Sequence, residues 1–399
     1  MLFTGGKKWS EAFNVLHEKS GIKGIMKSKS FIILLTICCV LAIATFFIFN
    51  KKSNTNQQTK LGQKLFDNLK VNDIAKITIN STDGAVILKK EKTFWTVENR
   101  FNYPADFSKI TDLAKKLKEL KIGRRFNASG DIISRLSLHQ PDNKGIPPSQ
   151  KGIQIVLVDK QKKILLDLIL GKIRESSSRS GGQYVMLSTT STVYLVDQNF
   201  RFLEKEPKQW LNKDLIDIKA KDIEKVICFT PGREKVIYAI KRPEKEQPPE
   251  FVNAPRNRKV ETSKINQVVE ALTGLKIEDI ADPGKNIKQT KFKNTPYFEY
   301  YLFDGTVYNI YPGLAMDNDS EKHYYRVYAS HIPSQDKEGD VTTDSSKEDK
   351  SRQENQAEPS VTVNHLNKKL GSWIYIVSKW ENNKFITDPE EFFINENVE

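Results

Sequence analysis

The chain has 399 residues, of which 63 are Lys or Arg, 50 are Asp or Glu, 38% are hydrophobic and 10% are aromatic. This composition is typical of a globular protein and excludes collagen-like repeats and disorder throughout the chain. Of the three cysteines, Cys38 and Cys39 are adjacent, which leaves Cys228 without a partner in the rest of the chain. A disulfide scaffold is therefore excluded, and the length suffices for two ordinary domains.

Residues 31–49, FIILLTICCVLAIATFFIF, contain no charged residue. Nineteen uncharged residues, with Thr36 and Thr45 as the only hydroxyls, are enough for a helix that spans the hydrocarbon core of a bilayer. Residues 1–30 carry six lysines and two glutamates, and the positive-inside rule therefore predicts a cytoplasmic N-terminal tail. A cleaved signal peptide is the alternative, because Ala42 and Ala44 form an A-x-A pattern, but the apolar run continues beyond that point. We therefore expect an uncleaved single-pass anchor that binds the lipid bilayer.

The positive charge is unevenly distributed along the chain. Residues 53–216 contain 28 basic and 17 acidic residues, a net charge of +11, whereas residues 217–399 have a net charge of −4. A basic region held near a membrane is attracted to anionic headgroups or to acidic envelope polymers. The lysines are dispersed, which also fits an ordinary solvated surface. Nucleic acid is not an expected partner outside the cytoplasm.

An internal repeat organises the region after the anchor. Residues 106–122 and 261–277 align without a gap and are identical at seven of 17 positions. Similar segments, DIAKITI and DIEKVIC, precede them at residues 73–79 and 222–228. The sequence therefore predicts a cytoplasmic tail, an anchor, a linker and two copies of one unit. The expected boundaries are 1–30 for the tail, 31–49 for the anchor, 50–70 for the linker, and 71–216 and 217–399 for the two copies.

Each copy is expected to contain one amphipathic helix. In residues 106–122 the apolar side chains recur at intervals of three and four, and Asp106 can cap the first turn. Residues 261–277 keep the same apolar face, although Gly274 in the last turn should cost about 1 kcal/mol relative to Ala.

Four short runs rich in β-branched and aromatic residues follow each helix, separated by polar turns that suit antiparallel neighbours. A polar stretch at residues 334–360, before the last strand, is expected to be a disordered insertion. The predicted fold class is therefore α+β: an N-terminal transmembrane helix followed by a duplicated unit of antiparallel strands with one helix per repeat. The expected strands are 153–158, 164–170, 184–187 and 193–196 in the first copy, and 297–303, 307–311, 324–328 and 373–377 in the second.

The order of several motifs resembles a known family. Phe94, Trp95 and Val97 precede a Pro-Ala-Asp at residues 104–106, and LGK at 170–172 precedes YVMLSTTSTVYLVD at 184–197. This order is similar to that of domain of unknown function 4340, over roughly Val71 to Phe393. Where such proteins usually have Tyr-Gly-Leu before a proline, this chain has Leu-Ser-Leu at 136–138. The resemblance implies a bacterial inner-membrane protein with an extracytoplasmic domain, associated with an ABC-2-type permease or a gliding-motility-type auxiliary subunit. It implies no catalytic residue.

No motif points to catalysis, a cofactor or a metal. The five histidines include no pair at helical ligand spacing and none lies near a cysteine in the sequence. The serine-rich stretch at 176–183 lacks a phosphate-loop pattern, and paired carboxylates such as Asp279 with Asp282 are best interpreted as solvated. The histidines are His17, His139, His323, His331 and His365.

Tyrosine is the one residue type that is strongly clustered, with eight of the 13 tyrosines within 32 residues. Such side chains are strand formers, but they also suit an interaction surface that stacks on sugar rings or docks a partner. The candidate surface comprises Tyr297, Tyr300, Tyr301, Tyr308, Tyr311, Tyr324, Tyr325 and Tyr328.

Three functions remain open on this basis. The first is a non-enzymatic, membrane-anchored accessory or scaffold for an ABC-type export or gliding-motility-like envelope complex. The second is a module that binds an envelope glycan or an acidic polymer, and the third is an envelope hydrolase with an unrecognised site.

Overall fold

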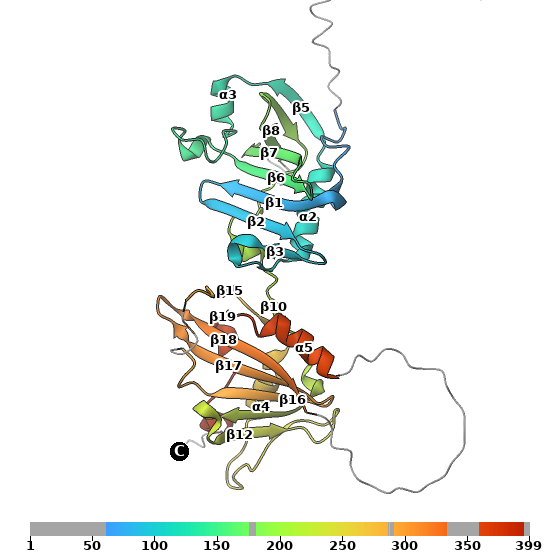
Figure 1. Ribbon diagram of the computed structural model, residues 1–399. Helices are drawn as coiled ribbons and strands as arrows, with labels where there is room; N and C mark the ends of the chain where they lie inside the picture. The colour runs from blue at the N-terminus through green and yellow to red at the C-terminus, as the bar shows by residue number, and fades with distance from the viewer. Residues whose placement is uncertain (1–60, 175–180, 286, 288–290, 333–358, 395–399) are drawn as a thin grey trace, which may run out of the picture. The chain divides into compact units, whose positions relative to one another are not determined.

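A computed structural model describes residues 61–174, 181–285, 287, 291–332 and 359–394 (Figure 1). The predicted tail and anchor, residues 1–49, lie outside these residues. Within the described ranges no helix is both long and apolar enough to cross a membrane. Residues 61–216 are called the first half below, and residues 217–394 the second half.

The first half is built on one antiparallel sheet of nine strands in the order β4-β3-β2-β1-β6-β7-β8-β9-β5. Helix α2 packs its apolar stripe on the sheet. The elements are β1 Ile74–Ser81, β2 Gly84–Lys90, β3 Trp95–Val97, β4 Tyr103–Pro104, α2 Phe107–Glu119, β5 Ile122–Asn127, α3 Gly130–Arg135, β6 Ile153–Asp159, β7 Ile164–Ile173, β8 Gln183–Leu187 and β9 Thr192–Val196.

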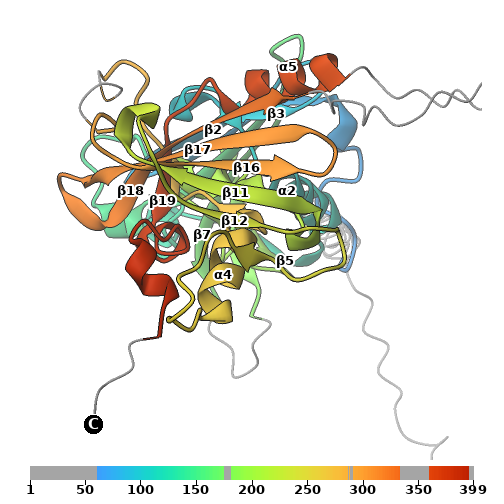
Figure 2. The same ribbon diagram turned by 90° about the horizontal axis from the view of Figure 1, so that it is seen from below.

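The second half is built on an antiparallel sheet of eight strands, β13-β12-β11-β16-β17-β18-β19-β15 (Figure 2). A two-stranded sheet pairs β10 with β14. The elements are β10 Asp214–Ile216, β11 Ile223–Phe229, β12 Val236–Lys241, β13 Glu250–Phe251, α4 Thr262–Val269, β14 Leu275–Lys276, β15 Asp279–Ile280, β16 Tyr297–Leu302, β17 Thr306–Met316, β18 Asp319–His331, α5 Pro359–Leu370, β19 Tyr375–Ser378 and α6 Lys379–Asn382.

The two large sheets share one order of elements. In each, two antiparallel strands (β1 and β2, or β11 and β12) precede the helix. A strand after the helix occupies the far edge: β5 follows α2 directly, whereas β14 lies between α4 and β15. The four strands predicted after each helix are present as β6 to β9 and β16 to β19. The chain is thus an α+β protein with large antiparallel sheets and few helices.

Helix α2 forms as predicted, and its capping explains where it begins. The Asp106 side chain accepts the backbone N–H of Ser108 and Lys109, at 3.0 and 3.3 Å. These bonds satisfy two of the amides that a helix leaves open at its start. Ile110, and with it Leu113 and Leu117, then form the buried stripe.

The prediction for the second helix is wrong at its end. Helix α4 stops at Val269, a 3-10 turn continues to Leu272, and Leu275 already belongs to β14. Thr273 is already extended, with φ −78° and ψ 110°, and Gly274 follows it with φ +63°, a left-handed conformation that glycine adopts without penalty. Its N–H donates to the Asp217 carboxylate at 3.0 Å. Gly274 therefore lies in the turn between the helical segment and β14, and not in a last helical turn.

The linker predicted at residues 50–70 extends too far toward the C-terminus. From Leu61 the chain belongs to the folded region: the Leu65 N–H donates to the Leu120 carbonyl at 2.7 Å, and Leu69 is 8% exposed in the core. Residues 50–60 lie outside the described ranges. The sequence suggested a linker here because this stretch is mostly polar, yet Leu65 and Leu69 supply enough apolar surface to anchor it.

Helix α5 was not expected. It begins at Pro359, inside the stretch 334–360 that was predicted to be disordered; residues 333–358 lie outside the described ranges. Asn367 of α5 covers a strand edge, because its side chain accepts the N–H of Ala329 at 2.8 Å and donates to the Ala329 carbonyl at 2.6 Å. Ala329 lies on β18 beyond the residues that pair with β19, and Asn367 thereby supplies hydrogen-bond partners to its backbone N–H and carbonyl.

A buried cluster runs through both halves. Tyr103 of the first half contacts the rings of Trp373 and Tyr375 edge-on, with centroids 5.3 and 6.4 Å apart. Arg100 and Asp279 form an ion pair at 2.9 Å. Both sheets and their cores lie within residues 61–394, which belong to one compact unit that begins at Leu61.

Candidate interaction face

The eight clustered tyrosines divide between the two faces of the second sheet, because successive side chains in a strand point to opposite faces. One face packs on α4 and its neighbours and is called the core face; the other is called the outer face. Tyr300, Tyr308 and Tyr325 lie on the core face and are 0%, 7% and 0% exposed.

The core-face tyrosines are held by buried hydrogen bonds. The Tyr300 hydroxyl donates to the Val268 carbonyl of α4 at 3.0 Å, and the Tyr325 hydroxyl donates to Asn382 Oδ1 of α6 at 2.8 Å. Burial raises the pKa of both phenols well above the usual value. The prediction that Tyr300, Tyr308 and Tyr325 belong to an exposed interaction surface is therefore wrong. These side chains are buried, and their bulk fills the core.

The outer face carries a row of four aromatic rings, one from each of the strands β11, β16, β17 and β18. Phe229 and Tyr297 stack with centroids 5.1 Å apart, and Tyr297 and Tyr311 stack at 4.9 Å. Tyr328 meets Tyr311 edge-on at 6.0 Å. We call Phe229, Tyr297, Tyr311 and Tyr328 the aromatic row. Tyr311 and Tyr328 remain partly exposed, so the row presents ring surface on this face of the sheet.

An arginine lies over each end of the aromatic row. The Arg233 guanidinium is 5.2 Å from the Phe229 ring centroid, and that of Arg326 is 5.1 Å from the Tyr328 centroid. A guanidinium over a ring face is attracted by the quadrupole of the ring. These contacts preorganise the row, because they restrict the rotamers of the side chains at both of its ends.

A buried carboxylate lies beside the row. Glu299 is 3% exposed; it pairs with Arg233 at 3.0 Å and accepts the hydroxyl hydrogen of Tyr301. Burial, followed by the contact with Glu299, raises the pKa of Tyr301 to about 12. Burial also raises the pKa of Tyr297 to about 12. Both Glu299 oxygens have partners, Oε1 in Arg233 and Oε2 in Arg233 and Tyr301, so this buried carboxylate stabilises the face.

Tyr324 has a separate role at the end of the outer face. It is 8% exposed and packs in a small apolar cluster with Ala281, Ile374 and Ile376. Of the eight tyrosines, Tyr301 joins Tyr311 and Tyr328 as the partly exposed members. The candidate surface on the outer face therefore contains fewer tyrosines than the eight predicted.

Sequence reasoning missed the non-tyrosine members of this face. Phe229 and Arg233 lie far from the tyrosine cluster in the sequence, and only strand pairing brings Phe229 opposite Tyr297. Arg326 stands between Tyr324 and Tyr328 at alternate positions of one strand, which places all three on one face. This alternation is the sequence signal that could have placed Arg326 on the same face as the two tyrosines.

A serine–histidine contact in the first half bears on the hydrolase interpretation. Ser134 Oγ and His139 Nε2 are 2.9 Å apart. A nucleophilic serine also needs a group that orients its histidine, and within the described part of the chain no carboxylate bonds His139. The described residues also contain no group of three or more His, Cys, Asp or Glu side chains that could hold a metal. His323 is partly buried, and desolvation lowers its pKa.

Comparisons with known proteins place the chain in a family without assigning an activity. No curated protein and no solved structure matches it. The sequence model described as "Domain of unknown function (DUF4340)" matches residues 95–295, a narrower range than the Val71 to Phe393 expected from the motifs. This match covers half of the chain and includes the first sheet from β3 onwards, α4 and β11 to β13. The chain therefore belongs to the family of domain of unknown function 4340.

Proposed function

We propose that the protein is a non-enzymatic, single-pass membrane protein whose extracytoplasmic region acts as an accessory or scaffold for an envelope complex. The apolar stretch at residues 31–49 and the six lysines before it support an anchor in the bacterial inner membrane with a cytoplasmic N-terminus. The partner class proposed is an ABC-2-type permease or a gliding-motility-type auxiliary subunit, as the family resemblance implies.

The aromatic row is the observation that carries this proposal. Tyrosine and arginine are enriched at the centres of protein interfaces, because large rigid side chains bury much area at a small entropic cost. Here the rings are already stacked, and Arg233 and Arg326 fix both ends. A partner that packs on Tyr311 and Tyr328 would therefore find a preordered surface.

The shared strand order of the two sheets supports a tandem duplication as the origin of the scaffold. The sequence repeat at residues 106–122 and 261–277 places α2 and α4 at corresponding points of that order. The duplicated units have since diverged on their outer faces. The first sheet has a hydrogen-bonded polar series there, in which Gln154 bonds Asn80 and Asp167 at 3.1 and 2.8 Å, whereas the second has the aromatic row. Such divergence suits two units with separate binding roles.

A second candidate is binding of an envelope glycan or acidic polymer. Partly exposed tyrosine rings can stack on sugar rings, and Lys225 lies 4.3 Å from the Tyr301 ring centroid on the same face. This alternative predicts binding by the isolated region that weakens at high salt.

The experiment that tests the proposal is gentle crosslinking in native membranes, followed by purification through a C-terminal tag and mass spectrometry. Stoichiometric recovery of a multi-pass permease or its auxiliary subunit would support the scaffold. Recovery of the protein alone, or only with envelope polymer, would contradict it and favour the second candidate. The matched variants are Tyr311→Ala with Tyr328→Ala on the row, and Tyr184→Ala with Tyr194→Ala, partly exposed tyrosines of the first sheet. Only the first pair should lose the partner.

A further inference from the structure

Two grooves flank helix α2 in the first half. The larger, of about 500 Å³, lies between α2 and strands β1 to β3 and is lined by Trp95, Phe107 and Ile110 among others. The smaller, of about 310 Å³, lies on the other side of the helix and is lined by Phe200 and Phe202 among others. Helix α2 therefore stands between two partly apolar depressions.

Each groove has a phenylalanine beside it that the fold leaves in solvent. Phe107 is 63% exposed and Phe202 is 89% exposed, although burying such a ring fully would be favourable by about 2–3 kcal/mol. Leu61, just before the segment that bonds the end of α2, is also 63% exposed. Exposed aromatic and aliphatic side chains around one amphipathic helix are typical of a surface that enters the headgroup region of a bilayer.

The same surface is rich in unpaired lysines. Lys64, Lys90, Lys115 and Lys118 line the larger groove, and within the described ranges none of them forms an ion pair. By contrast, the lysines of the second half are commonly paired with carboxylates, as in Lys245 with Asp222 and Lys384 with Glu381. These four lysines, set against Glu119 in the same lining, are thus left available for an anionic partner on the α2 surface.

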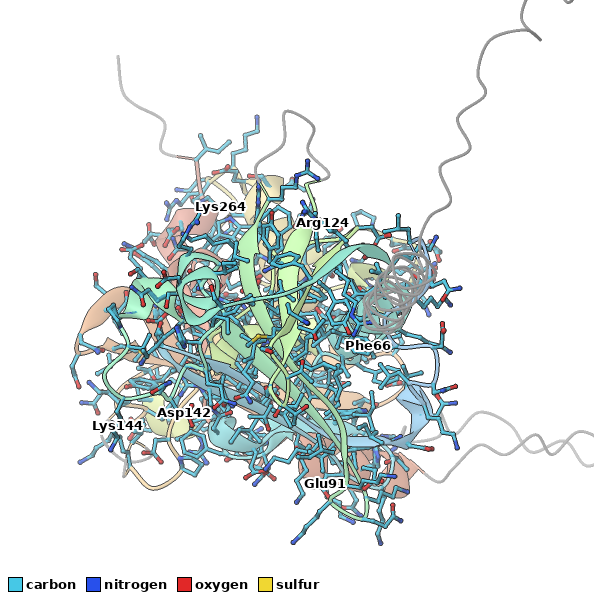
Figure 3. The ribbon with its side chains drawn as sticks, turned by 90° about the horizontal axis from the view of Figure 1, so that it is seen from above. Phe66, Glu91, Arg124, Asp142, Lys144 and Lys264 are labelled. Atoms are coloured by element: carbon cyan, nitrogen blue, oxygen red, sulfur yellow. The ribbon has the colours of Figure 1, made fainter. Side chains whose placement is uncertain are left out.

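The described chain begins at this surface. The Gly62 N–H donates to the Ile122 carbonyl at 2.8 Å, and the Leu65 N–H donates to the Leu120 carbonyl at 2.7 Å, so the described chain begins alongside the end of α2. Ten residues, 51–60, separate Leu61 from the predicted membrane segment, and ten residues can span at most about 35 Å. In Figure 3, Phe66 lies on the opposite side of the first half from Asp142 and Lys144.

We propose that the α2 surface, defined by α2 and its two grooves, docks on the anionic headgroups of the bilayer that holds the anchor. Phe107 and Phe202 would enter the headgroup region while the lysines contact lipid phosphates. This inference rests on the membrane anchoring in the proposed function. It adds an orientation: the first half lies against the membrane, and the aromatic row of the second half is left for a protein partner.

The test uses the fragment 61–399, since both sheets and their cores lie within it. Cosedimentation is measured with vesicles of phosphatidylcholine alone and of phosphatidylcholine with 30% phosphatidylglycerol. The test variant is Lys64→Glu, Lys115→Glu and Lys118→Glu, all exposed on the α2 surface. The control variant makes the same charge change at three exposed residues, Arg135→Glu, Lys144→Glu and Lys172→Glu. Arg135 is the last residue of α3, the Lys172 N–H donates to the Leu136 carbonyl just after α3, and Lys144 lies on the side away from Phe66 (Figure 3).

The expected result is binding to the anionic vesicles that weakens with salt and falls by at least about 100-fold in the test variant, since each lysine near an anionic surface contributes about fivefold. The control variant should lose less than about tenfold. Equal losses in both variants would overturn the proposal, because only net charge would then matter. No preference for anionic over neutral vesicles would also overturn it, as would full competition by soluble polyphosphate at equal phosphate concentration.

A second readout locates the surface. The fragment contains Cys228 as its one cysteine, and Cys228 is fully buried. An environment-sensitive dye on Phe107→Cys should shift its emission to the blue with anionic vesicles, whereas the same dye on Lys144→Cys should not. Shifts of equal size would contradict the proposed orientation. Neither experiment requires the proposed protein partner, so failure of the scaffold proposal and failure of this inference are distinguishable.

Discussion

The separation of the tyrosines between two faces predicts sharply different costs for their removal. Tyr300 is wholly buried on the core face, whereas Tyr328 is partly exposed on the outer face. Replacing a buried aromatic side chain by alanine costs about 3–5 kcal/mol, and loss of the bond to the Val268 carbonyl adds about 1 kcal/mol. We therefore expect Tyr300→Ala to lower the free energy of unfolding by about 4–6 kcal/mol.

Two further variants serve as comparisons for Tyr300→Ala. Tyr300→Phe keeps the ring and removes the hydroxyl, and it should cost about 1 kcal/mol. Tyr328→Ala removes an edge-on contact with Tyr311 and the contact with Arg326, and should cost about 1–2 kcal/mol.

The assay is urea unfolding of the fragment 61–399, followed by circular dichroism, with equal m-values required for the comparison. If Tyr300→Ala does not fold, Tyr300→Phe still tests the buried bond. A cost for Tyr300→Ala no greater than that for Tyr328→Ala would refute the division into a core face and an outer face.

Three other predictions follow from the described contacts. Asp106→Ala removes the cap of α2 and should lower the free energy of unfolding by about 1 kcal/mol in urea, whereas the exposed Asp112→Ala should change it by less than about 0.5 kcal/mol. Because Tyr297 and Tyr301 have folded-state pKa values of about 12, against about 10 when unfolded, their contribution to stability is complete below pH 10 and is lost as the pH rises through 12. Unfolding measured between pH 9 and pH 12 should show this decline, and a flat profile would contradict it. Cys228 is buried, which raises the pKa of its thiol to about 12, so it should resist a thiol reagent in the native fragment and react in urea.

The sequence predicted the strands well where one face of a strand is buried. In strand β6 the buried Ile155 and Leu157 alternate with partly exposed residues, and that period of two is visible in the sequence. Strand β5, Ile122–Asn127, was missed because its side chains are mostly exposed and polar, so its sequence shows no apolar alternation. Helix α5 was missed for a related reason, since it begins within a polar stretch.

The candidate face could be predicted only in part. The tyrosine cluster was evident, but the face on which each ring lies depends on the exact strand bounds, and a shift of one residue exchanges the two faces. The opposition of Phe229 to Tyr297, and the reach of Arg233 to Glu299, depend on the pairing of β11 with β16. Contacts between residues so far apart in the chain follow from the folded topology and not from a local pattern.

The central claim is that the outer face of the second half binds a protein partner in the membrane. The most direct measurement is site-specific photocrosslinking in native membranes, with benzoylphenylalanine at Tyr328 and, as the control, at Tyr184 of the first sheet. The account predicts that the probe at position 328 crosslinks a multi-pass membrane protein and that the probe at position 184 does not. Crosslinking of that protein equally from both positions, or from neither while the protein is fully expressed, would contradict the claim.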